Sequence, residues 1–452
     1  MTDGANMEEF FNPKTVALIG ATDRKDSVGL GIAKNLLSGL VKRKIFFINP
    51  NKKKILGQRV YKSIQDVPDS VDLAIIAVPS IVVFEAAEDC LRKKVKGAII
   101  VSSGFSETGL EGVKREQRIG ELFQKSGISF LGPNCLGIIN PNDNFNGSFA
   151  PGLPKKGGIA FISQSGALID VLIDHSLTED YGFSSMVSFG NAGGLDVVDF
   201  LEYFSQDEKT KVIVLYLEAL KDGRKFVEAA KRISLLKPIV VLKAGSTGAG
   251  SLAAMSHSAS LVGDSQVYSA AFRKAGVYEV FGLKELINVS WALSLQEKVK
   301  GGLGIITNAG ALGVLAADAC DRAGVALAKL TLESKGQLKN SKIMSRAMNF
   351  NNPLDIIGDA LSDRYEFALK VMLSQENIGC CLVNISFQIM TDIEKIAQVV
   401  IEQKKNFPKK AVVCCLAGGY FSGEAVRKMK RAGIPVFQTP EEAVLAVKAL
   451  CC

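Results

Sequence analysis

The chain has 452 residues, of which 47% are apolar and 43 are glycine. This composition excludes a disordered protein, and the length suggests about three α/β domains of roughly 100 to 200 residues each. The net charge of +8 permits nucleic-acid binding, but the lysines form no dense run with aromatic residues between them. Phosphorylated small molecules are therefore the expected anionic partners, and no nucleic acid is expected.

The first third of the chain alternates short apolar runs with amphipathic stretches. The runs predict strands at residues 15–20, 45–48, 73–78, 97–101 and 128–131, with a helical pattern at residues 31–40. Because these strands are apolar throughout, they are typical of a parallel sheet covered on both faces. Residues 1–130 are therefore predicted to form a doubly wound, Rossmann-like domain.

Two further sets of strands follow. The second set is predicted at residues 158–162, 185–189, 212–217 and 239–243, and the third at 303–307, 381–385, 411–416 and 435–437. Between them, residues 295–302 (LQEKVKGG) are charged and then glycine-rich, as a linker or a helix end would be. The predicted second and third domains are residues 131–295 and 300–452.

These two domains contain an internal similarity. Residues 157–168 read GGIAFISQSGAL and residues 301–312 read GGLGIITNAGAL. A strand, a polar turn and a helix start recur in the same order, which indicates two copies of one unit. The alternative is coincidence, because any strand-to-helix turn favours small polar residues.

The turn after the first strand is rich in glycine and hydroxyl groups. Gly20 and Thr22 precede Ser27, Val28 and Gly29, which open a helix. Free backbone N–H groups and the positive end of the helix dipole favour a phosphate at such a turn, so a nucleotide is the expected ligand. The spacing is not G-x-G-x-x-G, and the second strand ends in Asn-Pro where a dinucleotide site carries an acidic residue, which disfavours NAD.

Lysines follow the second strand. After Pro50 the chain reads Asn-Lys-Lys-Lys, which places Lys52 where a 2′- or 3′-phosphate of an adenosine could be bound, and CoA carries a 3′-phosphate. The alternative is an ordinary exposed charged loop. Ligands of open α/β sheets bind at the carboxyl ends of the strands. Further candidates at those ends are Val78, Pro79, Ser80, Ser102, Gly104 and Asn134.

The nine cysteines have no C-x-x-C spacing, so they are interpreted as reduced thiols and no metal site is predicted. No basic start is followed by an apolar stretch, and no apolar run reaches the ~18 to 20 residues that span a bilayer. We therefore expect a cytoplasmic protein without a membrane partner.

Motifs along nearly the whole chain resemble the NDP-forming acyl-CoA synthetases of the succinyl-CoA synthetase superfamily. The first domain carries VALIGAT, INPNKKKILG, AVPS, SSGFSETG and FLGPNCLGI; the second carries AFISQSGAL, SFGNAGGLDVVDFLEYF, LYLEALKDGRKF and SHSAS; the third carries ITNAGALGVLAADAC and NNPLDIIGDA. The resemblance implies a Rossmann-like CoA-binding domain followed by two flavodoxin-like ligase domains. It also implies that the strand-end residues named above bind CoA as a substrate.

The family reaction also needs an ATP-grasp module, for which no sequence pattern is found here. The resemblance therefore implies the alpha subunit of an ADP-forming acetyl-CoA or acyl-CoA synthetase. It would pair with a separate ATP-grasp beta subunit, typically as an alpha2beta2 heterotetramer. Mg²⁺ would accompany ADP or ATP on that partner subunit.

The chain has two histidines, and they differ in context. His175 lies in a helical pattern and is interpreted as a structural or surface residue. His257 lies among small residues at 245–260, a stretch without helical amphipathicity that predicts a mobile loop presenting one imidazole. The residues alone leave its role open. The resemblance implies that His257 becomes phosphorylated and that Glu218, at the end of a strand, orients its ring.

A phosphoryl group needs donors that do not titrate, and the two repeated helix starts can provide them. These predicted phosphate-binding residues are Ser165, Gly166, Ala167, Asn308, Ala309 and Gly310. The implied reaction converts acyl-CoA, ADP and phosphate into the acid, CoA and ATP. The alternatives are a non-enzymatic CoA-sensing module, which would need no reactive histidine, and a nicotinamide-dependent oxidoreductase.

Overall fold

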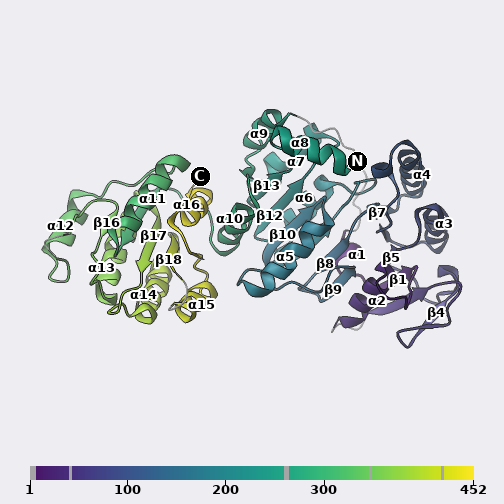
Figure 1. Cartoon of the computed structure of the whole chain (residues 1–452), viewed down its shortest axis with the longest axis horizontal. Helices are drawn as coiled ribbons and strands as arrows, with labels where there is room; N and C mark the ends of the chain where they lie inside the picture. The colour runs from purple at the N-terminus through teal and green to yellow at the C-terminus, as the bar shows by residue number, and fades with distance from the viewer. Residues whose placement is uncertain (1–6, 40–42, 259–263, 346–347, 419–421, 452) are drawn as a thin grey trace. The chain divides into compact units, whose positions relative to one another are not determined.

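The computed structural model describes residues 7–39, 43–258, 264–345, 348–418 and 422–451, and for residues 254–258 this description covers the backbone. The chain divides into two compact units, Met1–Phe281 and Gly282–Cys452. Among the described residues, the first unit contains two seven-stranded sheets and the second unit one five-stranded sheet. Figure 1 shows the first sheet in purple and dark blue, the second in blue and teal, and the third in green and yellow.

The first sheet has the Rossmann strand order. Its strands are β1 (Thr15–Ile19), β2 (Lys44–Ile48), β3 (Lys54–Ile55), β4 (Gln58–Tyr61), β5 (Leu73–Ile76), β6 (Gly97–Ile100) and β7 (Ser129–Leu131). The helices around it are α1 (Glu8–Phe11), α2 (Val28–Ser38), η1 (Ile64–Asp66), η2 (Ser80–Val82), α3 (Val83–Lys93), η3 (Ser106–Thr108) and α4 (Leu110–Ser126). The order is β3-β4-β2-β1-β5-β6-β7, parallel apart from β3. The strand order therefore reverses between β1 and β5, which is where such sheets bind ligands.

The second sheet combines a parallel core with an antiparallel hairpin. Its strands are β8 (Gly137–Asn140), β9 (Phe145–Ser148), β10 (Lys156–Ser163), β11 (Phe183–Ser188), β12 (Val212–Leu217), β13 (Ile239–Lys243) and β14 (Tyr278–Val280). The helices are α5 (Gly166–Thr178), α6 (Val197–Gln206), α7 (Gly223–Ile233), α8 (Gly248–Ser258) and α9 (Ser265–Lys274). The order is β14-β13-β12-β10-β11-β8-β9, and β8 runs antiparallel to β11.

The third sheet is parallel throughout. Its unit contains α10 (Leu283–Leu295), β15 (Gly302–Thr307), α11 (Gly310–Ala323), α12 (Leu332–Asn340), β16 (Leu354–Asp355), α13 (Ser362–Leu373), β17 (Ile378–Ser386), α14 (Ile393–Asn406), β18 (Ala411–Ala417), α15 (Gly423–Arg431), β19 (Val436–Phe437) and α16 (Pro440–Cys451). The order β16-β15-β17-β18-β19 repeats that of β11-β10-β12-β13-β14. The prediction of a Rossmann-like domain followed by two flavodoxin-like domains is therefore confirmed.

Hydrogen bonds also repeat between the two flavodoxin-like domains. At the end of β10, the Ser163 hydroxyl accepts a hydrogen bond from the Ser165 amide (3.0 Å) and donates one to the Ser165 carbonyl (2.7 Å). At the end of β15, the Thr307 hydroxyl does the same with the Ala309 amide (3.1 Å) and carbonyl (2.8 Å). The two strand-to-helix turns thus share a bracing contact as well as a sequence pattern, which favours duplication over coincidence.

Some local structure differs from the sequence-based predictions. The hairpins β3–β4 and β8–β9 were not predicted. Residues 295–302, predicted as a linker or a helix end, begin where α10 ends at Leu295 and lie within the second unit. There the buried Gln296 side chain donates to the Val412 carbonyl (2.6 Å) and accepts from the Val412 amide (2.9 Å). A glutamine that satisfies both amide groups in the interior anchors this segment rather than leaving it free. None of the described helices has the length and apolar character to cross a bilayer.

Candidate functional site

The backbone approaches itself closely at the turn between β1 and α2. Gly20 has φ +93°, and a Cβ atom there would lie 2.2 Å from the Ala77 carbonyl oxygen. A Cβ atom on Gly29 would lie 2.3 Å from the Gly20 carbonyl oxygen. Both glycines are therefore required for the start of α2 to rest against β1 and the end of β5. The turn lies where the strand order reverses.

The first turn of α2 has no side-chain cap. The Ser27 hydroxyl donates to the Arg24 carbonyl (2.6 Å) and makes no capping hydrogen bond, while the Thr22 hydroxyl accepts from the Arg24 amide (3.1 Å). The two hydroxyls thus shape the loop and leave the first amides of the helix to other partners. An anion is the partner that these amides favour.

The loop after β2 is tied to the loop after β1. The Lys52 ammonium lies 3.0 Å from an oxygen of Asp23, and its hydrogen bond lowers the pKa of that carboxyl group. Asn49, which occupies the position of the acidic residue in dinucleotide sites, donates to the Ala21 carbonyl (2.8 Å). Pro50 follows it in an exposed turn. The structure therefore brings Lys52 and Pro50 beside the glycine turn, with part of the lysine charge shared with Asp23.

A first cavity of about 380 Å³ opens at the carboxyl edge of the first sheet. Six residues predicted to bind CoA or phosphate line it: Val28, Val78, Pro79, Ser102, Asn134 and Gly166. The Ser102 hydroxyl donates to the Val78 carbonyl (2.6 Å), which holds the ends of β5 and β6 together. Ser80 and Gly104 also meet next to it, because a Cβ atom on Gly104 would lie 2.6 Å from the Ser80 hydroxyl oxygen.

The start of α5 reaches this cavity from the second sheet. Ser165 is the N-cap of α5, and its hydroxyl accepts from the Leu168 amide (3.4 Å). Gly166 lines the cavity, and a Cβ atom on it would lie 3.0 Å from the Leu136 Cβ atom. Ala167, the third residue predicted here, is exposed. Residues at the edge of the first sheet and the start of α5 therefore line the same first cavity.

A second cavity of about 320 Å³ lies at the carboxyl edge of the second sheet. Glu218 lines it, as do Gln164, Asn191 and Asn134, and Asn134 also lines the first cavity. The Gln164 side-chain oxygen accepts hydrogen bonds from the amides of Glu218 and Ala219, the latter at 3.0 Å. Gln164 therefore fixes the backbone of Glu218 at the end of β12.

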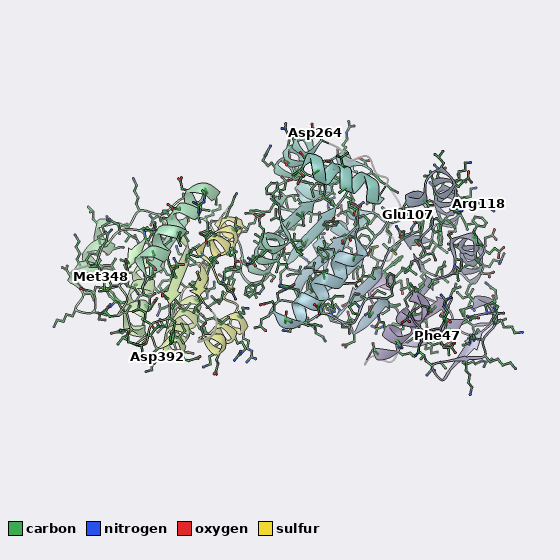
Figure 2. The ribbon with its side chains drawn as sticks, in the orientation of Figure 1. Phe47, Glu107, Arg118, Asp264, Met348 and Asp392 are labelled. Atoms are coloured by element: carbon green, nitrogen blue, oxygen red, sulfur yellow. The ribbon has the colours of Figure 1, made fainter. Side chains whose placement is uncertain are left out.

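Sequence reasoning missed several polar residues of this region. Asn191 donates to Glu107 (2.7 Å) and to Glu116 (2.9 Å), and it accepts from Asn134 (3.2 Å). Burial raises the pKa of Glu107, but hydrogen bonds from Asn191 and from backbone amides outweigh burial and bring it below its usual value. Glu107 lies in the motif SSGFSETG and Asn191 in the motif SFGNAGG. Their membership in these motifs is the sequence feature that points to both residues. Figure 2 labels Glu107 on the side of the first sheet that faces the second.

The two histidines lie on different helices. His175 is exposed in the last turn of α5, and its Nδ1 atom lies 2.9 Å from the Tyr181 hydroxyl, in agreement with a structural or surface role. His257 belongs to α8, so the predicted loop at this position is wrong. The His257 side chain lies outside the described part of the structure.

The helix at residues 248–258 has a local cause. The Thr247 hydroxyl accepts from the Gly250 amide (3.1 Å), and the Thr247 carbonyl accepts from the Ser251 amide (2.7 Å), which starts the helix. Alanine and leucine, which are among the best helix formers, follow in the segment GAGSLAAMSHS. A helix with an exposed Leu252 therefore forms here without an amphipathic sequence pattern.

The second set of predicted phosphate-binding residues lies in the second unit. The buried Asn308 side chain donates to the Ser386 carbonyl (2.9 Å) and accepts from the Ser386 amide (2.8 Å), so both its polar atoms are occupied. Ala309 is the N-cap of α11 and has no side-chain cap, and Gly310 begins the helix. Backbone amides, rather than the asparagine side chain, are what this helix start offers to an anion.

Comparisons with known proteins agree with this architecture. The chain matches the family models described as CoA binding domain over residues 14–141, Succinyl-CoA ligase like flavodoxin domain over residues 156–293, and Ligase-CoA domain over residues 303–450. A solved structure of acetyl-coenzyme A synthetase 1 from Candidatus Korarchaeum cryptofilum, in complex with phosphate and ADP, is 34% identical. It superposes with a TM-score of 0.93 over 99% of this chain and 96% of that one.

Two curated relatives set the extent of the match. The acetate-CoA ligase (ADP-forming) I of Archaeoglobus fulgidus is 42% identical over 98% of this chain, which spans 63% of that longer protein. The acetate-CoA ligase (ADP-forming) II subunit alpha of Pyrococcus furiosus is 37% identical over 98% of this chain and 97% of its own length. The chain therefore belongs to the ADP-forming acetate-CoA ligase family, and it matches an alpha subunit of that family over nearly all of its residues.

Proposed function

We propose that this chain is the alpha-type part of an ADP-forming acyl-CoA synthetase, which converts acyl-CoA, ADP and phosphate reversibly into the acid, CoA and ATP. One observation carries the proposal: the two cavities at the carboxyl edges of the first two sheets share Asn134. The first is lined by the candidate CoA residues and the second by Glu218. A thioester held in the first cavity could thus be attacked beside a carboxylate suited to orient a histidine.

The chemistry follows in two steps on this chain. A phosphate oxygen attacks the thioester carbonyl, the carbon–sulfur bond breaks, and CoA leaves with the electron pair as an acyl phosphate forms. A ring nitrogen of His257 then attacks phosphorus, and the phosphorus–oxygen bond to the acyl group breaks to release the acid. Glu218 would accept a hydrogen bond from the opposite ring N–H, which fixes the tautomer and stabilises the charge that develops.

The helix start of α5 in the first unit and, separately, that of α11 in the second unit would each offer donors to a phosphoryl group. Each presents backbone amides and a partial positive charge equivalent to roughly half a unit. Each turn is braced by a hydroxyl, from Ser163 in one domain and Thr307 in the other. Fixed donors of this kind stabilise phosphoryl transfer without titrating.

Transfer to ADP would take place on a separate ATP-grasp beta subunit, in an alpha2beta2 heterotetramer. The Pyrococcus relative, named as a subunit alpha, supports a separate partner because the chain covers 97% of it. Mg²⁺ would neutralise charge on the nucleotide bound by that partner. We assign the complex to the cytoplasm, where thiols such as the buried Cys380 and Cys414 stay reduced.

The purified chain should bind CoA and yet form no ATP from acetyl-CoA, ADP and phosphate. It should form ATP once an ATP-grasp beta subunit is added, because the nucleotide would be bound there. Calorimetry measures the first property and a coupled luciferase assay the second. ATP formation without a partner would contradict the separate subunit. CoA binding without ATP formation in the reconstituted complex would instead identify a CoA-sensing module.

A further inference from the structure

The loop after β11 carries an asparagine whose side-chain polar groups all bond to the CoA-binding domain. Both N–H groups of Asn191 are used, one by Glu107 (2.7 Å) and one by Glu116 (2.9 Å). Its side-chain oxygen accepts from Asn134 (3.2 Å), and its backbone amide donates to the Pro133 carbonyl (3.0 Å). Asn191 itself follows β11 of the second sheet, so one side chain connects the two domains.

Glycines bring the backbone of this loop onto the CoA-binding domain. A Cβ atom on Gly190 would lie 2.3 Å from the Asn134 carbonyl oxygen, and one on Gly194 would lie 2.2 Å from the Phe130 carbonyl oxygen. The Leu195 amide donates to that same Phe130 carbonyl (2.8 Å). Side chains at these positions would push the loop away. The sequence Phe-Gly-Asn-Ala-Gly-Gly therefore fixes Asn191 in one place by backbone contact.

The two carboxylates that Asn191 joins also hold a second loop, residues 104–106, beside the first cavity. Glu107 accepts from the amides of Gly104 and Phe105, and Glu116 accepts from the amide (3.2 Å) and hydroxyl (2.6 Å) of Ser106. This loop continues directly from Ser102 and Ser103 of the cavity wall. Because both carboxylates contact one amide nitrogen, its N–H groups offset the repulsion between two like charges.

We infer that Asn191 is a positioning residue that aligns the CoA cavity with the Glu218 cavity. The inference rests on the proposed function and adds to it a residue that acts through Glu107 and Asn134 rather than on the reacting atoms. Asn134 is where the two cavities meet, and Asn191 holds its side chain. A misplacement of about 1 Å between reacting groups costs on the order of 100-fold in rate, so this alignment matters more for the reaction than for CoA binding.

The test replaces Asn191 by Asp, which keeps the shape but turns the donor into a third carboxylate. We expect the rate of chain phosphorylation from acetyl-CoA and phosphate to fall about 100-fold. The affinity for CoA should change far less, because the α2 turn is untouched. Adding Glu107→Gln to Asn191→Asp exchanges amide and carboxylate across the same hydrogen bond and should recover at least about tenfold of the loss. Asn142→Asp, at a side chain that donates to Ser184 (3.3 Å), is the matched control and should keep the wild-type rate.

Each outcome separates the inference from the function on which it rests. A wild-type chain that is not phosphorylated would end the proposed function, whatever Asn191 does. A phosphorylated wild type with an equally fast Asn191→Asp variant would overturn the positioning role. Equal losses of CoA affinity and rate, without recovery in the double variant, would make Asn191 a structural residue and also overturn the inference.

Discussion

Replacing Glu218 by Gln is expected to slow phosphorylation of His257 by about 10² to 10⁴-fold, the range for acid, base and orienting groups. The amide has the shape of the carboxylate and can still accept a hydrogen bond from the ring. It carries no negative charge, so it cannot stabilise the positive ring that forms as phosphorus is attacked. Gln164 binds the Glu218 backbone amide rather than its side chain, so the strand end should keep its place. Rapid-quench measurement of phosphorylated chain gives the rate.

Two controls make that result specific. Glu228→Gln changes the same chemical group on an exposed turn of α7 and should leave the rate unchanged. The melting temperature of Glu218→Gln should stay near that of the wild type, because Glu218 lines a cavity rather than the core. Wild-type phosphorylation kinetics in Glu218→Gln would remove this residue from the mechanism.

Replacing Gly29 by Ala is expected to destabilise the first domain by about 1 to 3 kcal/mol, as overpacking typically does, and to abolish measurable CoA binding. The added Cβ atom would lie 2.3 Å from the Gly20 carbonyl oxygen, a backbone atom that cannot rotate away. Relief requires the start of α2 to move from β1. That movement displaces the amides we assign to a CoA phosphate. Denaturant unfolding and calorimetry with CoA measure the two effects.

Gly31→Ala provides the matched control on the same helix. A Cβ atom there would lie 3.4 Å from the Phe149 Cβ atom, an ordinary contact. Since glycine inside a helix costs roughly 0.5 to 1 kcal/mol relative to alanine, this variant should be as stable as the wild type or slightly more so. If Gly29→Ala bound CoA as tightly as Gly31→Ala does, the close approach at the β1–α2 turn would have no role in binding.

The sheets were predictable because their central strands are continuously apolar. The segments Thr15–Ile19 and Leu73–Ile76 are buried almost throughout, and their carboxyl ends placed candidate ligand residues on one edge. Val78, Ser102 and Asn134 were taken from three different strand ends, and all three line one cavity. These residues meet because the strands that they follow are neighbours in the sheet. The rules for connections between parallel strands allow only a few strand orders, so this neighbourhood could be expected.

Short or locally determined features escaped prediction. The β3–β4 hairpin turns at Leu56 and Gly57, with φ values of 48° and 77°, and leucine is not a residue that indicates such a turn. Helix α8 depends on a cap from Thr247 rather than on an apolar stripe. Glu107 and Asn191 stand far apart in the sequence and meet only because the second sheet docks on the first. No local pattern encodes such a meeting.

Mapping the phosphorylated residue tests the account most directly. The chain is incubated with acetyl-CoA and phosphate at mildly alkaline pH, which preserves phosphohistidine, and is then analysed by intact mass and peptide mapping. The account predicts one added phosphoryl group, located on His257, lost in His257→Ala and retained in His175→Ala. Phosphorylation that persists in His257→Ala, or that maps to His175, would contradict it.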